Sequence, residues 1–201
     1  MIIGNDFVWL HFPKCAGTFT ERLLHKVVPP GLGVQFDPID PANVIWHQNY
    51  FQRENYLRQS LSGKDVICNF RRLPSWIISR IKYEQERSGQ VVSKEAYSKG
   101  FFFEQNGTEN HADNYVREYT KKTVSNWLRV EYLHEDFINV FSKYFDLENK
   151  CVSEIFMNKV NASGWDGNIC KWFDKEDLKI LYESCPKWAA LELELYGNIM
   201  Q

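Results

Sequence analysis

The chain has 201 residues, of which 44% are hydrophobic and 15% aromatic, so it is long and apolar enough to form a substantial core. Its net charge of −2 and pI of about 6.2 argue against a general nucleic-acid or membrane-surface binder, so a site for an anion has to be local. The five cysteines are widely spaced and include no C-x-x-C pair, which indicates a reducing compartment and neither a zinc site nor a disulfide framework. No signal peptide and no apolar run of about 18 residues is visible, so we expect a cytoplasmic protein without a membrane segment.

The first half of the chain alternates strand and helix signals, which is typical of an α/β domain with a parallel sheet. The apolar periodicity predicts strands at 7–11, 43–47 and 66–70. Each strand is followed by a predicted helix, at 17–28, 51–61 and 74–87. Gly63 is expected to end the second helix, because glycine adopts the left-handed conformation that closes a helix.

The second half continues with a helix at 114–122, a strand at 126–132 and a helix at 134–145. Residues 175–196 are helical in pattern but contain Pro186, so a kinked helix and two separate helices both stay open. No repeat and no second domain is visible. We therefore expect residues 1–201 to form a single domain.

Residues 88–110, between the two halves, are rich in Ser, Gly and Asn and include Phe101, Phe102 and Phe103. A segment of this length inside a compact domain is usually functional or disordered. Two interpretations stay open for its aromatic cluster. The residues belong either to a substrate loop that closes over an acceptor or to a core patch beneath the loop.

The segment between the first strand and the first helix has the composition of an anion-binding loop. It consists of His11-Phe12-Pro13-Lys14-Cys15-Ala16-Gly17-Thr18. The first N–H groups of a helix are unpaired and its dipole favours negative charge there. Ala16 and Gly17 let a phosphate approach the backbone, while Lys14 adds a positive charge and Thr18 a hydroxyl. Alternatively, Thr18 only caps the helix and Glu21 completes a capping box.

This loop differs from the nucleoside triphosphate loop G-x-x-x-x-G-K-[ST], because Lys14 precedes Gly17 instead of following it. It resembles the H-x-P-K-x-A-G-T loop of sulfotransferases, which use 3′-phosphoadenosine 5′-phosphosulfate (PAPS) as donor. The resemblance implies an α/β, P-loop-like three-layer fold with a central parallel sheet flanked by helices. It also implies a soluble, bacterial or phage-like relative of the carbohydrate-type enzymes. The residues that would hold the 5′-phosphosulfate are Pro13, Lys14, Cys15, Ala16, Gly17 and Thr18.

A second donor-binding element is expected where the third predicted strand ends. Sulfotransferases place an Arg there and a Ser eight residues later, and the resemblance implies that this pair holds the 3′-phosphate. Arg71 and Ser79 have this spacing. The family also has a proline two residues after the Arg, which would select Arg72 with Pro74 instead. We favour Arg71, because strand register fixes where a side chain points, and keep Arg72 as the alternative.

Three further residues are candidates on the acceptor side. The resemblance to carbohydrate sulfotransferases implies that His47, just after the second predicted strand, is the base that deprotonates the acceptor hydroxyl. A buried structural histidine is the other interpretation, and Glu54 in the next helix is then the alternative base. Asp113 to Arg117 resembles a D-N-x-x-T-R segment of the family with one residue missing, so Arg117 is either a substrate contact or a surface charge.

The sequence therefore predicts a sulfotransferase that moves a sulfuryl group from PAPS to a hydroxyl, most simply on a carbohydrate, with 3′,5′-diphosphoadenosine as product. Lys14 and His47 would be the catalytic residues, and no metal and no nucleic acid would take part. A nucleotide kinase-like P-loop phosphotransferase is one alternative. The other is a non-catalytic nucleotide- or glycan-binding module on the same fold.

Overall fold

The computed structural model describes residues 1–38, 44–103, 110–147, 156 and 167–201. It divides into two compact units, which are described one at a time. The first consists of Met1–Phe70 and Tyr119–Asn161, and the second of Arg71–Glu118 and Ala162–Gln201. The expectation of a single domain stays a prediction.

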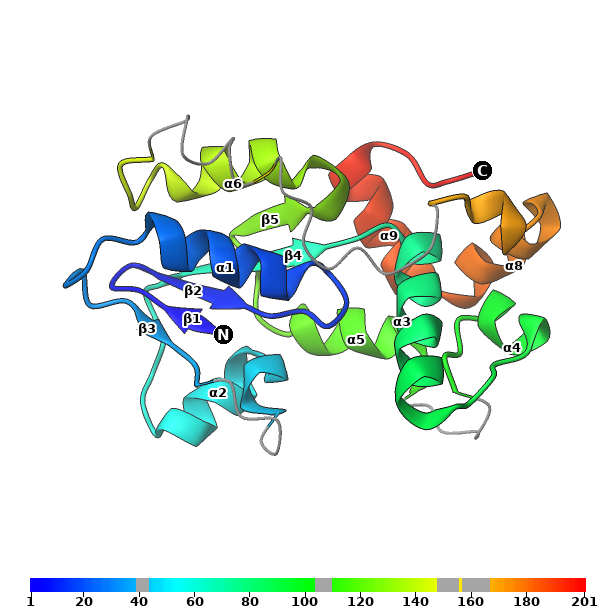
Figure 1. Cartoon of the computed structure of the whole chain (residues 1–201), viewed down its shortest axis with the longest axis horizontal. Coiled ribbons are helices and arrows are strands. Elements are labelled where there is room, and N and C mark those ends of the chain that lie inside the picture. Colours follow the sequence, from blue (N-terminus) through cyan, green and yellow to red (C-terminus); the bar gives the residue numbers. More distant parts are fainter. Residues whose placement is uncertain (39–43, 104–109, 148–155, 157–166) are drawn as a thin grey trace. The chain divides into compact units, whose positions relative to one another are not determined.

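The first unit is built on a five-stranded sheet with the order β3-β1-β2-β4-β5 (Figure 1). The strands are β1 (Ile2–Ile3), β2 (Phe7–Leu10), β3 (Gln35–Phe36), β4 (Asp65–Phe70) and β5 (Asn126–Arg129). β2, β4 and β5 are parallel, whereas β1 runs antiparallel to both β2 and β3. The chain is thus α/β with a sheet flanked by helices, as predicted; β2, β4 and β5 form the expected parallel part, and β1 and β3 add an antiparallel edge, so the sheet is mixed.

The helices of the first unit are α1 (Gly17–Val27), α2 (Tyr50–Leu57) and α6 (Leu133–Phe141), with 3₁₀ turns η1 (Val44–His47) and η3 (Val130–Tyr132). The predicted strand at 43–47 is wrong, because its described part forms η1. Three apolar residues in a row, Val44 to Trp46, do not distinguish a short strand from a helical turn. The second helix ends at Arg58, which is left-handed with φ 52°, and not at Gly63.

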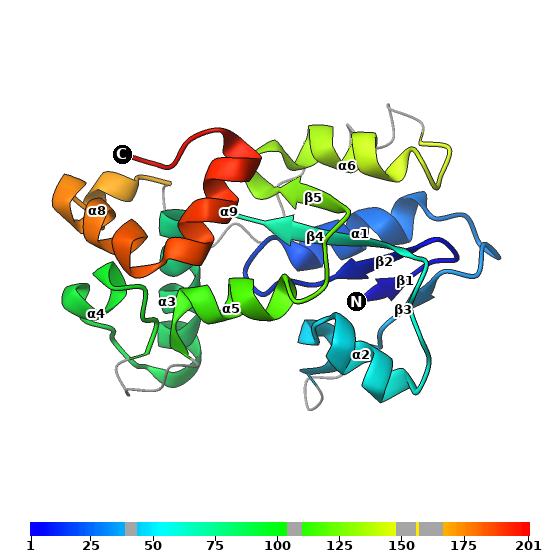
Figure 2. The ribbon, with the colours of Figure 1, turned by 180° about the vertical axis from the view of Figure 1, so that it is seen from behind.

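The core of the first unit lies between the sheet and two helices on one of its faces. α1 and α6 cover this face; α1 stands in front of the strands in Figure 1 and behind them in Figure 2. Alternate residues of each strand point to this side, as the pleat requires. The buried residues of this core include Phe7, Trp9, Ile67, Leu128, Leu23, Leu24, Phe137 and Phe141.

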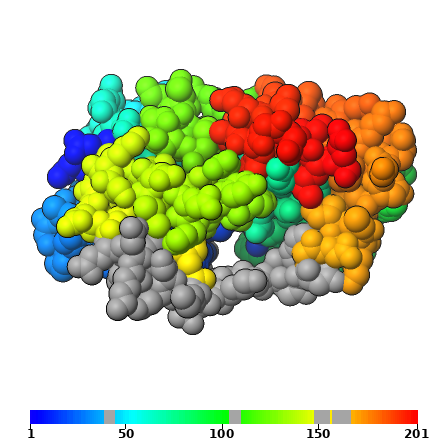
Figure 3. Space-filling view, turned by 90° about the horizontal axis from the view of Figure 1, so that it is seen from above, coloured from blue at the N-terminus to red at the C-terminus, as the bar shows by residue number. Residues whose placement is uncertain are grey.

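The second unit contains α3 (Leu73–Ser88), α4 (Lys94–Ser98), η4 (Ile169–Lys171), α8 (Lys175–Ser184), α9 (Pro186–Tyr196) and most of α5 (Ala112–Tyr119). α8 and α9 lie side by side (Figure 3). The pattern at 175–196 therefore forms two helices, because Pro186 cannot continue the first one and occupies the first turn of the second.

The aromatic cluster at 101–103 contributes to the core of the second unit. Phe102 is 1% exposed, and its ring lies 5.7 Å from those of Trp76 and Tyr115. The core interpretation is therefore confirmed for Phe102. Residues 104–109 of the predicted substrate loop lie outside the described residues. Within the described ranges, no helix is long and apolar enough to cross a membrane.

Candidate functional site

The loop between β2 and α1 contains two residues with left-handed backbone. Lys14 has φ 64° and Ala16 has φ 57°, and neither is a glycine. Left-handed backbone at residues with a β-carbon is uncommon, costs about 1–3 kcal/mol and clusters at functional sites. Left-handed residues alternating with right-handed ones turn successive N–H groups toward one point, which forms a concave anion-binding nest.

Three consecutive N–H groups of this loop have no acceptor in the part of the chain that the structure describes. They belong to Ala16, Gly17 and Thr18. The next two N–H groups, of Phe19 and Thr20, bond to the Ala16 carbonyl at 3.1 and 3.0 Å. Unpaired donors at a helix start are where anions bind.

The other residues of the predicted loop differ in how deeply they are buried. Cys15 is buried, and its N–H donates to the carbonyl of Phe12 at 3.3 Å, so this N–H is not one of the unpaired donors. Pro13 is also buried, whereas Lys14 is half-buried. Thr18 is exposed in the first turn of α1.

The capping interpretation of Thr18 is wrong. The residue that caps α1 is Ala16, and the helix has no side-chain capping hydrogen bond. Glu21 lies buried in the helix instead of closing a capping box, and burial raises the pKa of its carboxyl. The start of α1 is therefore not satisfied by its own side chains.

His11 packs directly beneath the loop. A β-carbon on Gly17 would collide with the His11 imidazole, so the loop needs glycine at this position. Burial, followed by the effects of His47 and Lys14, holds the pKa of His11 well below its usual range, so its ring is neutral at neutral pH. Its Nδ1 is buried and has no hydrogen-bond partner among the described residues. His11 thus acts as a neutral support for the loop.

His47 lies beside this support. The rings of His11 and His47 meet edge to face with centroids 4.8 Å apart. The hydroxyl of Tyr119 lies 3.0 Å from the carbonyl oxygen of His11 and 2.6 Å from that of His47. The structure therefore places His47, the candidate general base, in contact with the histidine that packs beneath the loop. Tyr119, which is 72 residues from His47, has no motif that could have indicated this contact.

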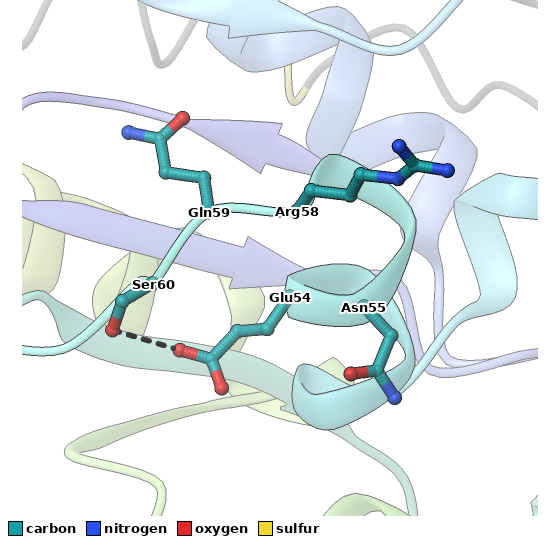
Figure 4. Close-up of a pocket in the computed structure, with 5 residues that line it drawn as sticks. All are labelled: Glu54, Asn55, Arg58, Gln59 and Ser60. Atoms are coloured by element: carbon teal, nitrogen blue, oxygen red, sulfur yellow. Dashed lines mark hydrogen bonds between the residues drawn. The ribbon is translucent and has the colours of Figure 1, made fainter.

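Glu54, the alternative base, holds a turn. Its Oε1 accepts the Leu61 N–H at 2.7 Å and the Ser60 hydroxyl at 3.2 Å. Both partners follow α2, and Figure 4 shows Glu54 pointing to Ser60 across an open depression of about 400 Å³. The remaining residues that line it are Asn55, Arg58 and Gln59. The arrangement favours a structural role for Glu54.

In the second unit, Arg72 is held by its own chain. Its guanidinium bonds to Glu192 at 3.0 Å and to Asn198 at 2.9 Å, and it stacks over the ring of Tyr196 at 4.3 Å. Arg71 directly follows β4 and uses its carbonyl to accept the indole N–H of Trp188 at 3.1 Å.

Ser79 and Arg117 complete the set of predicted site residues. Ser79 lies on α3 and is buried. Arg117 is exposed on α5 and lies 3.9 Å from the carboxylate of Glu118, which favours the interpretation as a surface charge. Asp113, at the start of the same segment, accepts the N–H groups of Lys187 and Trp188 and so caps α9.

No family model, curated protein or solved structure shows significant similarity to the chain. Among the described residues, no group of three His, Cys, Asp or Glu side chains is placed to hold a metal ion. The function must therefore be inferred from the geometry of the loop and its neighbours.

Proposed function

We propose that the protein is a sulfotransferase that uses PAPS as donor. The observation that carries this proposal is the loop before α1, with its two left-handed residues, Lys14 and Ala16, and its three N–H groups that have no acceptor among the described residues. Such a nest fits a tetrahedral anion. The order of residue types in the loop, which resembles that of sulfotransferases, favours a phosphosulfate over other anions.

Some residues of the loop would bind the donor, and Lys14 would take part in catalysis. The N–H groups of residues 16–18 would hold the 5′-phosphate, and the exposed Thr18 hydroxyl would add a donor. When bound, the donor supplies a sulfuryl group whose bond to the bridging oxygen breaks as the acceptor oxygen bonds to sulfur. Lys14 would stabilise the negative charge that the bridging oxygen gains, because its ammonium lies on the same loop.

His47 would accept the proton of the acceptor hydroxyl. Its ring touches that of His11, whose pKa is lowered well below its usual range. A neutral His11 matters here, because a proton taken up by His47 is then not opposed by a second positive imidazole. Tyr119, whose single hydroxyl hydrogen is shared between the two carbonyl oxygens, links the backbones of the two histidines.

For the 3′-phosphate, the second unit favours Arg71 over Arg72. The guanidinium of Arg72 already bonds to a carboxylate and an amide, and moving it would leave the buried Glu192 without a charge partner. The 3′-phosphate contact is therefore assigned to Arg71, with Ser79 as its partner by analogy with the family. The acceptor class, a carbohydrate hydroxyl, rests on the resemblance alone.

The direct test is transfer of labelled sulfate. The protein is incubated with ³⁵S-labelled PAPS and a panel of glycans and small alcohols, and labelled products are identified by mass spectrometry. Lys14→Ala should lower turnover by about 10²–10³-fold while weakening donor binding much less, because the charge acts mainly as the leaving oxygen departs.

Lys26→Ala is the matched control, since Lys26 is an exposed lysine at the other end of α1. It should leave turnover unchanged. Donor binding without transfer to any acceptor would favour the binding module. Magnesium-dependent phosphate transfer from a nucleoside triphosphate would favour the kinase and contradict the proposal.

A further inference from the structure

A buried chain of hydrogen bonds connects the sheet to the anion-binding loop. The indole Nε1 of Trp9 donates to Oδ1 of Asn69 at 2.7 Å, and Nδ2 of Asn69 donates to the hydroxyl of Thr20 at 2.8 Å. The Thr20 hydroxyl in turn donates to the carbonyl oxygen of Ala16 at 3.2 Å. Trp9, Asn69 and Thr20 are each 0% exposed.

The direction of this chain is fixed by its first member. An indole N–H can only donate, so Oδ1 of Asn69 faces Trp9 and Nδ2 must face Thr20. The Thr20 hydroxyl, having accepted from Nδ2, directs its own hydrogen to Ala16. Trp9 and Asn69 point to the same face of adjacent parallel strands, which is the face that α1 covers.

A polar side chain at position 69 is otherwise unexpected. Asn69 lies in β4 among Ile67, Cys68 and Phe70, all buried and apolar. Burying an amide is unfavourable unless its groups are paired, so an apolar residue would suit the core equally well if packing alone mattered. The side-chain amide of Asn69 therefore has a structural role that an apolar side chain could not have.

That role follows from the geometry of the peptide between Ala16 and Gly17. The Ala16 carbonyl receives the Thr20 hydroxyl and the N–H groups of Phe19 and Thr20, all from the protein side. In a planar trans peptide the C=O and the next N–H point in opposite directions. Fixing the Ala16 oxygen inward therefore turns the Gly17 N–H outward, and this N–H is one of the three for which the described part of the chain offers no acceptor.

We propose that Asn69, acting through Thr20, is a positioning residue that aims the Gly17 N–H at the bound anion. This inference rests on the proposed function only in that the loop binds a phosphate group. The same chain of bonds holds Ala16 in its left-handed conformation before any ligand arrives, so less ordering is left for the binding step.

The test measures phosphate binding at the Gly17 amide. Inorganic phosphate is titrated into ¹⁵N-labelled full-length protein, and the shift of the Gly17 amide resonance gives the affinity. Thr20→Val keeps the shape of the side chain but removes the bond to Ala16, so we expect about tenfold weaker binding and a smaller Gly17 shift. Thr20→Ser restores the hydroxyl and should restore both.

The matched control is Tyr144→Phe. It removes the 2.5 Å bond to Asp65, the first residue of the strand that carries Asn69. This variant should lose stability but bind phosphate as the unaltered protein does. If Thr20→Val does not fold, Asn69→Asp serves, because an ionised carboxylate cannot donate to Thr20 and draws its hydroxyl hydrogen away from Ala16.

The outcomes separate the two proposals. If the Gly17 amide of the unaltered protein does not respond to phosphate, the anion-binding loop and this inference both fail. If it responds and Thr20→Val or Asn69→Asp binds phosphate equally well, the inference is overturned while the proposed function stands.

Discussion

Two helices that follow neighbouring parallel strands begin in opposite ways. α3, after β4, has the N–H of Leu73 bonded at 2.8 Å to the carboxylate of Glu192, which is 0% exposed and also accepts from Tyr182 and Arg72. α1, after β2, begins at left-handed Ala16 with no capping side chain. One helix start thus holds an anion that the chain supplies, and the other is unfilled by any residue that the structure describes.

The two helix starts differ in whether a carboxylate of the protein occupies them. The same dipole and the same unpaired N–H groups arise at both places. At α3 they stabilise the fold by binding a carboxylate, whereas at α1 we propose that they bind an anionic ligand. Changes around α1 should therefore alter binding and turnover, and changes around the start of α3 should alter stability.

The largest effect is expected at His47, close to the open helix start. His47→Ala should lower turnover by about 10²–10⁴-fold, because no group would then accept the acceptor proton. Donor affinity and the free energy of unfolding should change little. The control is His25→Ala, which removes an exposed imidazole in the last turn of α1. Near-normal turnover of the His47 variant would remove this residue from the mechanism.

The next effect is expected at the filled helix start. Glu192→Gln removes the charge that pairs with Arg72 and weakens the bond to Leu73. We expect the free energy of unfolding in urea to fall by about 3 kcal/mol, with phosphate affinity unchanged. Glu194→Gln, two residues further along α9 and exposed, should change stability by no more than about 0.5 kcal/mol. Weaker phosphate binding in the Glu192 variant would contradict the expectation that the start of α3 affects stability and not binding.

Arg71 and Arg72 are adjacent in the sequence, but we expect one to affect nucleotide binding and the other to affect stability. Arg71→Ala should weaken binding of 3′,5′-diphosphoadenosine by about 10–100-fold relative to adenosine 5′-monophosphate, because the lost contact belongs to the 3′-phosphate. Arg72→Ala should instead lower stability through Glu192 and Asn198 without changing this selectivity. Calorimetric titration of each variant with both nucleotides measures this selectivity. The reverse result would assign the 3′-phosphate contact to Arg72.

The smallest effect concerns pH. His11 has a lowered pKa, so between that value and about 6.5 the unfolded chain binds the proton that the folded chain does not. This difference makes the folded state less stable as pH falls through the window. Replacing His11 by Gln should flatten that part of the curve of unfolding free energy against pH. A slope identical to that of the unaltered protein would show that His11 is not buried as a neutral ring.

Long periodic segments were predictable, and short ones were not. The 16-residue helix α3 and the six-residue strand β4 carry clear apolar patterns, and both were predicted to within one residue. β1 and β3 have two residues each, which is too short for any period, so the antiparallel edge of the sheet was missed.

Part of the candidate site could be predicted from the sequence, and part could not. The loop itself was visible because its residue types are local and ordered. The partners that shape it were not, because they lie far away in the chain. Asn69 is 49 residues from Thr20, and Tyr119 is 72 residues from His47. No local pattern encodes such contacts, and the left-handed backbone of Ala16 was hidden because alanine rarely adopts it.

The close approach of Gly17 to His11 has a consequence for how this loop can evolve. Any side chain at position 17 would occupy the space of the imidazole, so the two positions are mutually constrained. A lineage could accept a larger residue at 17 only after the ring at 11 had become smaller. Related sequences should therefore show covariation between these two positions, six residues apart, and a chain that combines His at the first with any residue but Gly at the second should lack the nest.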